Sequence, residues 1–112
     1  MPRGMGRGRG MMGPMMDPRS RFFMALASDQ RLRILSLLKD GEKNSAEITR
    51  ALELDPSVIS RHLMMLRNVG LVIARREGAV LFFSLSDKRV WDIIDTATAI
   101  IKDWLDKHQQ FF

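Results

Sequence analysis

The stretch DPSVISRHLMMLRNVG, residues 55–70, carries the strongest signals of local structure in this chain. Asp55 has the side chain of a helix N-cap. Pro56 follows it, and proline suits the first position of a helix because its missing N–H would have no partner there. Gly70 closes the stretch with the residue preferred just beyond a helix end. We therefore expect one helix over residues 56–69.

The two sides of this helix differ in chemistry. Successive residues lie about 100° apart around a helix axis. This rotation gathers Ile59, Leu63 and Leu66 in one narrow arc, which we expect to face a core. The opposite side, called here the outward face, is mostly polar and should remain exposed. It consists of Ser57, Ser60, Arg61, Met64, Arg67 and Asn68.

Three shorter helices are predicted before this one, over residues 19–27, 29–39 and 45–52. Ser28 offers a hydroxyl cap to the second of them. Asn44, with Glu47 three residues later, resembles a capping box that opens the third. A short helix, a tight turn and a longer helix in this order form a helix-turn-helix.

Two segments rich in β-forming residues follow, over residues 71–76 and 79–85. Glu77 and Gly78 separate them, which indicates a tight antiparallel hairpin. A hairpin directly after a helix-turn-helix is the wing of a winged helix-turn-helix. The predicted fold class is therefore mainly α with a small β-hairpin (α+β), with the wing over residues 71–85.

A last helix is expected to begin at Ser86 and Asp87. Its apolar residues repeat along about five turns, in an apolar stripe longer than one small chain can cover. We expect a second copy of the chain to cover it, so that the fold is dimeric. The predicted dimer interface consists of Phe22, Phe23, Leu26, Val90, Ile93, Ile94, Ala97, Ile101 and Trp104.

The composition limits the class of protein. The chain has 112 residues, of which 46% are hydrophobic, and a formal net charge of +5, so we expect one folded domain. The longest apolar run, residues 79–83, is too short to span a bilayer. The chain has no cysteine, which excludes a disulfide, a thiolate metal site and a thiol redox sensor within it. No membrane association is expected, and the predicted location is cytoplasmic.

The first twenty residues have a composition of their own, with six Met, five Gly and four Arg. Such a segment has little to bury, so residues 1–20 are predicted to be a disordered tail and residues 21–112 the folded domain. Four thioethers in the tail have the softness that Cu(I) prefers. They belong to Met11, Met12, Met15 and Met16. A disordered tail without any ligand is the alternative.

Several motifs resemble the ArsR/SmtB family of repressors in their order and spacing, over residues 22–105. They are Ala27-Ser28-Asp29, Arg31-Leu32-Arg33-Ile34-Leu35, Ile59-Ser60-Arg61-His62-Leu63 with Leu66, Val69-Gly70-Leu71-Val72 and Arg75-Arg76-Glu77-Gly78. The resemblance implies a homodimeric transcriptional repressor that leaves its operator when an inducer binds. The chain lacks the cysteines of many members, and His108 is the sole imidazole near the last helix. No cofactor is therefore predicted, and the inducer stays unknown.

The side chains expected to meet double-stranded DNA lie on the outward face and on the wing. Arginine can donate two hydrogen bonds to guanine, and serine can bond a base edge or a phosphate. The charge distribution agrees, because residues 60–90 carry +4 and residues 91–112 carry −2. We assign base recognition to Ser57, Ser60 and Arg61, and phosphate contacts mainly to Arg67, Arg75 and Arg76, with Met64 and Asn68 beside them. Family members often carry a basic residue where this chain has Ala79, so the wing tip should contact DNA weakly.

An enzyme is not predicted. Ser60 and His62 point about 200° apart on a helix, so they cannot pair as nucleophile and base, and His62 is expected at the rim of the core. The last helix carries four aspartates opposite its apolar stripe, which is typical of a solvated face. They are Asp92, Asp95, Asp103 and Asp106. Two alternatives to a repressor stay open: a winged-helix module that binds another protein, and a nonspecific architectural DNA-binding protein that relies on its tail.

Overall fold

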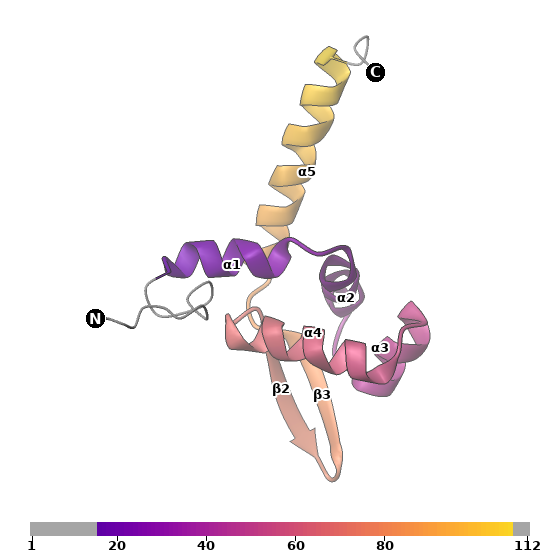
Figure 1. The fold of residues 1–112 in the computed structure, drawn as a ribbon. Coiled ribbons are helices and arrows are strands. Elements are labelled where there is room, and N and C mark those ends of the chain that lie inside the picture. The colour runs from indigo at the N-terminus through magenta and orange to yellow at the C-terminus, as the bar shows by residue number, and fades with distance from the viewer. Residues whose placement is uncertain (1–15, 109–112) are drawn as a thin grey trace, which may run out of the picture.

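The computed structural model describes residues 16–108, which form helices around a three-stranded antiparallel sheet (Figure 1). The elements are α1 (Pro18–Leu26), α2 (Asp29–Lys39), β1 (Lys43–Asn44), α3 (Ser45–Leu52), α4 (Pro56–Asn68), β2 (Val72–Glu77), β3 (Val80–Leu85) and α5 (Arg89–His108). This order confirms the predicted winged helix-turn-helix. None of the helices in residues 16–108 combines the length and apolarity needed to cross a bilayer.

The predicted caps set the helix boundaries. The Ser28 hydroxyl accepts a hydrogen bond of 3.2 Å from the backbone N–H three residues later. Asn44 and Glu47 exchange side-chain to backbone bonds of 2.9 and 2.8 Å, which completes the capping box. Asp55 accepts from the N–H of Ser57 at 2.9 Å. These bonds satisfy backbone donors that have no partner within the helix.

The first helix begins earlier than the sequence indicated. Asp17 caps it by accepting a 2.8 Å bond from the N–H of Arg19, and Pro18 occupies its first position. The boundary predicted between residues 20 and 21 therefore lies inside α1. The rest of the predicted tail, residues 1–15, lies outside the described residues, as do three of the four methionines considered for Cu(I).

The sheet has the strand order β1-β3-β2. The sequence did not predict β1, which is too short to show a pattern. The hairpin turn also lies one residue later than predicted, because Glu77 pairs with Val80 and leaves Gly78 and Ala79 as the central residues. Gly78 has φ of 63°, and a type II′ turn places glycine at this first central position because that backbone conformation disfavours a Cβ.

The core lies where α2, α3 and α4 meet the base of the sheet. Ile59, Leu63 and Leu66 of α4 are buried in it, as the predicted arc requires. The other buried apolar residues are Ala25, Ile34, Leu35, Leu38, Ile48, Leu52, Leu71, Val72, Phe83 and Val90. With its apolar arc inside, α4 has its orientation fixed, and its outward face is left to solvent.

Two elements project from this body. The hairpin β2–β3 extends on one side, and α5 extends as a single helix on the other (Figure 1). Val90, in the first turn of α5, is the residue of that helix that the core buries. Most of α5 therefore makes no contribution to the core of its own chain.

Candidate nucleic-acid interface

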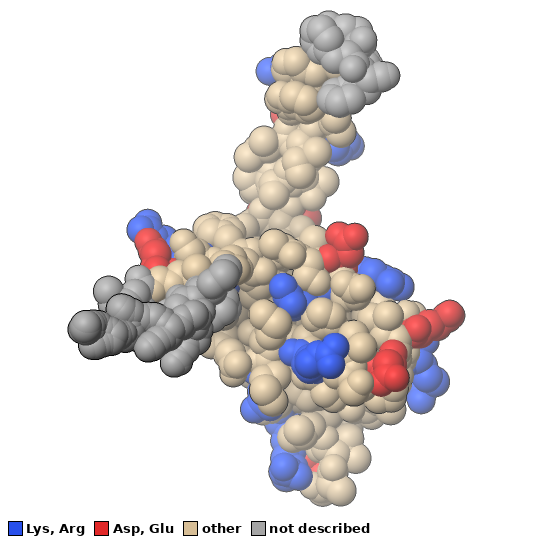
Figure 2. Space-filling model, in the orientation of Figure 1, with Lys and Arg blue, Asp and Glu red and all other residues tan. Residues whose placement is uncertain are grey.

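The outward face of α4 is exposed along its whole length. Met64 at its centre is 61% exposed. Within residues 16–108, the side chains of Ser60, Arg61, Arg67 and Asn68 make no hydrogen bond or ion pair with another residue. Their donors are therefore available to an external acceptor. In Figure 2, basic side chains lie over α4 and along the hairpin below it.

Ser57 differs from the other residues of this face. Its hydroxyl donates a 2.7 Å hydrogen bond to Asp55, which also accepts the Ser57 backbone N–H. These two bonds lower the pKa of the Asp55 carboxyl. The single hydroxyl hydrogen of Ser57 is thus committed to the cap, and only its oxygen lone pairs can accept a further bond.

The two wing arginines point to opposite faces of the sheet, because side chains alternate along a strand. Arg76 lies opposite Leu81 and shares its face with the buried Val72. Arg75 lies opposite Phe82 on the other face. Arg76 makes no ion pair with any described residue, whereas Arg75 forms two hydrogen bonds with Glu42.

Arg31 of α2 connects three helices beneath the outward face, a role that the sequence analysis missed. Its Nε donates to the carbonyl of Ala25 at 2.7 Å and its Nη2 to that of Met24 at 3.2 Å. Its Nη1 lies 3.3 Å from Nδ1 of His62 and also 3.3 Å from the sulfur of Met65, both on α4. Arginine can only donate, so Nδ1 of His62 is the acceptor and Nε2 carries the proton.

His62 is half-buried, as predicted for the rim of the core. Burial lowers its pKa, and the positive charges of Arg31 and Arg61 lower it further. The imidazole is therefore neutral at neutral pH, which matches its role as an acceptor for Arg31.

The predicted dimer-interface residues divide into two groups. Phe22, Leu26 and Ile94 pack partly against the core, and Val90, only 4% exposed, belongs to the core itself. The others remain exposed, together with two further residues of the stripe. The exposed group consists of Phe23, Ile93, Ala97, Ile100, Ile101, Trp104 and Leu105.

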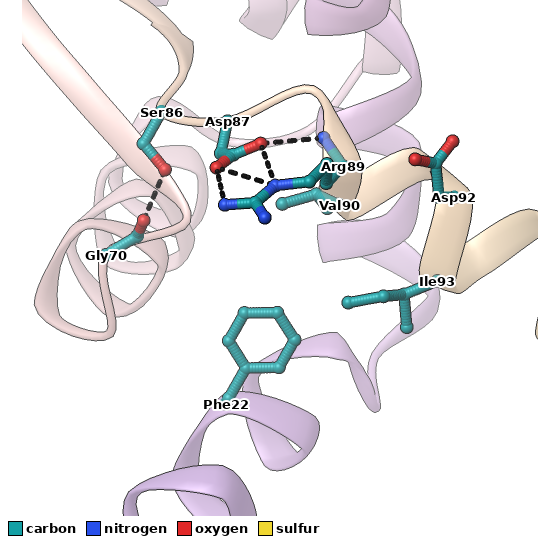
Figure 3. Close-up of a pocket in the computed structure, with 8 residues that line it drawn as sticks. All are labelled: Phe22, Gly70, Ser86, Asp87, Arg89, Val90, Asp92 and Ile93. Carbon is teal, nitrogen blue, oxygen red and sulfur yellow. Dashed lines mark hydrogen bonds and ion pairs between the residues drawn. The ribbon is translucent and has the colours of Figure 1, made fainter.

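A pocket of about 630 Å³ lies where α1 meets the start of α5 (Figure 3). Phe22 of α1 and Ile93 of α5 lie on two sides of it, and Ile93 belongs to the exposed apolar group. At its rim, Arg89 donates side-chain and backbone hydrogen bonds to Asp87 and lowers the pKa of that carboxyl to about 2. The Ser86 hydroxyl donates to the carbonyl of Gly70. The side chains of Ser86, Asp87 and Arg89 at this rim therefore already have partners.

The aspartates of α5 are exposed along their own side of the helix. Within residues 16–108, no group of three His, Cys, Asp or Glu side chains is arranged to hold a metal ion.

Comparison with known proteins places these features in a family. The model of the bacterial regulatory protein, arsR family, matches residues 28–74. A probable mercury resistance operon repressor of Streptomyces lividans is 38% identical over 87 residues, which cover 78% of this chain and 70% of that protein. The transcriptional activator HlyU of Vibrio cholerae is 41% identical over 71 residues, which cover 63% of this chain and 66% of HlyU. These relatives are transcriptional regulators and not enzymes.

Solved structures agree with the sequence relatives. The crystal structure of Rv0081 from Mycobacterium tuberculosis matches with a TM-score of 0.75 and 28% identity, over 86% of this chain and 97% of that one. The homodimeric winged helix-turn-helix DNA-binding domain Mb0332 of Mycobacterium bovis, solved by NMR, matches with a TM-score of 0.72 and 32% identity, over 82% and 85% of the two chains. The chain therefore belongs to the ArsR family of bacterial regulatory proteins and has their winged helix-turn-helix fold.

Proposed function

We propose that this protein is a homodimeric transcriptional repressor that binds an inverted DNA repeat through α4 and the wing. The observation that carries the proposal is the outward face of α4, an exposed row of polar side chains whose donors are largely unengaged. The core arc fixes the orientation of this face relative to the hairpin. Arg61 near its middle suits guanine, and Met64 offers an apolar contact for a thymine methyl.

A second copy of the chain supplies the symmetry of the proposed site. In a twofold-symmetric dimer, the exposed residues of the apolar stripe would be buried against the same stripe of a second copy. The two α4 helices then meet successive major grooves about 34 Å apart. The homodimeric state of the Mb0332 domain supports this arrangement.

Binding-site selection with the purified full chain tests this function. We expect an inverted repeat whose half-sites lie about one helical turn apart. The affinity for that repeat should fall steeply as the salt concentration rises, because bound phosphates release counterions. Recovery of no shared motif would contradict sequence-specific recognition. Binding without any dependence on salt would favour the alternative of a protein-interaction module.

The direction of regulation needs its own experiment, because the relatives include both a repressor and an activator. Transcription in vitro from a promoter that contains the selected repeat should decrease when the protein is added. An increase at the same promoter would contradict repression and leave DNA binding intact. An inducer is expected to reverse the effect, and its chemical class stays open.

A further inference from the structure

Arg75 of the wing forms side-chain contacts across the sheet. The Nε and Nη2 atoms of Arg75 donate hydrogen bonds of 2.9 and 2.7 Å to the two carboxylate oxygens of Glu42. Its guanidinium carbon also lies 4.9 Å from the centre of the Phe82 ring. We call these three residues the wing clasp. Its two-pronged geometry holds the Arg75 side chain in one orientation more firmly than a single contact would.

The clasp joins the outer strand of the wing to the body of the protein. Arg75 is on β2, Phe82 is opposite it on the middle strand β3, and Glu42 comes just before β1. The Arg75 side chain therefore crosses the middle strand to reach the turn that follows α2.

The wing clasp lies where the hairpin leaves the body of the protein. On β3, only Phe82 and Phe83 pair with β1. The Arg75 and Phe82 pair is therefore the last rung of the hairpin with a third strand beside it. Beyond that rung, residues 76–81 form a two-stranded ribbon, which has little stability of its own. A constraint at this rung sets the angle at which the ribbon leaves the body.

We propose that Arg75 is a positioning residue, which fixes the wing through Glu42 and Phe82 and leaves the phosphate contact to Arg76. This inference rests on the proposed DNA-binding function, and it changes the role that the sequence assigned to Arg75. Glu42 occupies two donors of Arg75, and Glu77 lies 3.7 Å from its Nη1, so both carboxylates offset the Arg75 charge. Arg76 is on the other face of the same strand and has no ion pair with any described residue, so its charge is available to DNA.

The two partners also favour each other's charged state. The hydrogen bonds from Arg75 lower the pKa of the Glu42 carboxyl, and Glu42 raises the pKa of Arg75. The ion pair therefore persists across the neutral pH range. Both side chains remain in contact with solvent, at 51% and 35% exposed, so their removal should leave the core intact.

The first experiment needs no DNA. Backbone relaxation and amide exchange of the wing are measured by NMR in the full chain and in the variants Arg75→Gln, Glu42→Gln and Arg76→Gln. Both Arg75→Gln and Glu42→Gln should raise the mobility of residues 77–80. Arg75→Gln should raise it at least as much as Glu42→Gln, because it also removes the contacts with Phe82 and Glu77, and Arg76→Gln should not raise it. The double variant Glu42→Gln/Arg75→Gln should be no more mobile than Arg75→Gln alone. A wing equally ordered in all variants would overturn the proposal, whatever the protein binds.

The second experiment measures affinity for the selected repeat as a function of salt concentration. Arg75→Gln and Glu42→Gln should each weaken binding by about three- to fivefold, the scale of one exposed ion pair. The salt slope should stay unchanged in both. Arg76→Gln should instead lower that slope by about one, as expected when one phosphate contact is lost. A slope lowered by Arg75→Gln, or tighter binding by Glu42→Gln, would show that Arg75 contacts phosphate itself and would overturn the proposal.

Two further variants distinguish the effect of Arg75 on the position of the wing from the effect of its positive charge on DNA binding. Arg75→Lys keeps the positive charge but cannot make the two-pronged bond, so it should behave like Arg75→Gln. If it bound DNA as tightly as the parent, Arg75 would act as a charge and the proposal would fail. The exchanged pair Glu42→Arg/Arg75→Glu should recover wing order relative to either of its single variants. If the parent chain bound no DNA, the proposed function would fail, and the NMR result would still decide the role of the clasp.

Discussion

Arg31 shows how one half-buried side chain can organise several helices. The carbonyls of Met24 and Ala25 lie at the C-terminal end of α1, where a helix leaves acceptors without intrahelical partners, although the Met24 carbonyl also accepts the N–H of Ala27. The Arg31 guanidinium bonds both of them and also reaches His62 on α4. Arg31 thus bonds the C-terminal end of α1 and joins it to α4, the helix proposed to contact the DNA bases.

Replacing Arg31 with alanine should therefore destabilise the fold. Arg31→Ala leaves the Ala25 carbonyl and one imidazole nitrogen without their donor, and the Met24 carbonyl with only the N–H of Ala27. We expect a loss of about 1 to 3 kcal/mol in the free energy of unfolding. Urea denaturation followed by circular dichroism measures it. Arg33→Ala, an exposed arginine on the same helix, is the matched control and should stay within about 0.5 kcal/mol of the parent. Equal stability of the two variants would contradict this role.

The lowered pKa of His62 makes the stability depend on pH. Because the pKa is lower in the folded than in the unfolded chain, the unfolded chain binds more protons as the pH falls. The contribution of His62 is therefore fully present above its ordinary pKa of 6.5 and is lost as the pH falls through the lower folded value. Thermal unfolding between pH 8 and pH 5 should show a shallower pH dependence in His62→Gln than in the parent. An identical dependence would contradict a half-buried, neutral His62.

Sequence reasoning succeeds at the residue scale where the partners are close in the chain. The caps at Ser28, Asn44 and Asp55 depend on bonds to residues two or three positions away, so their pattern is visible without a structure. Arg31 bonds the carbonyls of a different helix and reaches His62 31 positions away, and Arg75 finds Glu42 33 positions away. A lone arginine among helical or strand residues looks solvated, and only the fold brings its partner to it.

At the scale of elements, the hydrophobic period and the length of a segment decide whether the sequence predicts it. The helix α4 has a cap, a proline and more than three turns of apolar period, and its bounds differ from the prediction by one residue. The strand β1 has two residues and shows no period at all. The hairpin was predicted, but its turn was misplaced because Glu77 and Gly78 fit a turn pattern as well as Gly78 and Ala79. Strand pairing, a non-local property, decides between them.

The outward face of α4 yields a prediction about base recognition. Arg61→Ala should weaken binding to the selected repeat by about 1 to 3 kcal/mol and relax the preference at one base position of each half-site. Quantitative binding to a library of repeats with single substitutions measures both effects. Lys102→Ala, on the helix α5 that projects away from the wing, removes the same charge and should change neither. If the Arg61→Ala profile matched that of the parent, the outward face would not be the reading surface.

At the scale of the whole molecule, the hairpin and α5 project from opposite sides of one small core (Figure 1). The hairpin is held by the sheet and the wing clasp, whereas the apolar side of the outer half of α5 stays largely exposed within residues 16–108. Ile100, Ile101 and Trp104 are 63%, 56% and 49% exposed. An isolated helix with an open apolar side is marginal in water, so a partner is expected to stabilise it.

The last prediction tests whether the exposed stripe is needed for dimerisation and not for the folding of the single chain. Ile101→Glu places a charge on the exposed stripe, and burying it against a second copy would cost several kcal/mol. We expect the dissociation constant of the dimer to rise by about tenfold or more, and affinity for the inverted repeat to fall with it. Lys102→Ala is the matched control, because it also makes α5 more negative by one unit but on a neighbouring residue outside the stripe. Sedimentation velocity at micromolar concentration, with circular dichroism of each variant, distinguishes the outcomes.

Because Ile101 contributes nothing to the core, the Ile101→Glu protein should keep its winged domain as a folded monomer. Dimers of unchanged strength in that variant would place the interface elsewhere, and loss of the winged domain itself would mean that α5 supports the fold of its own chain.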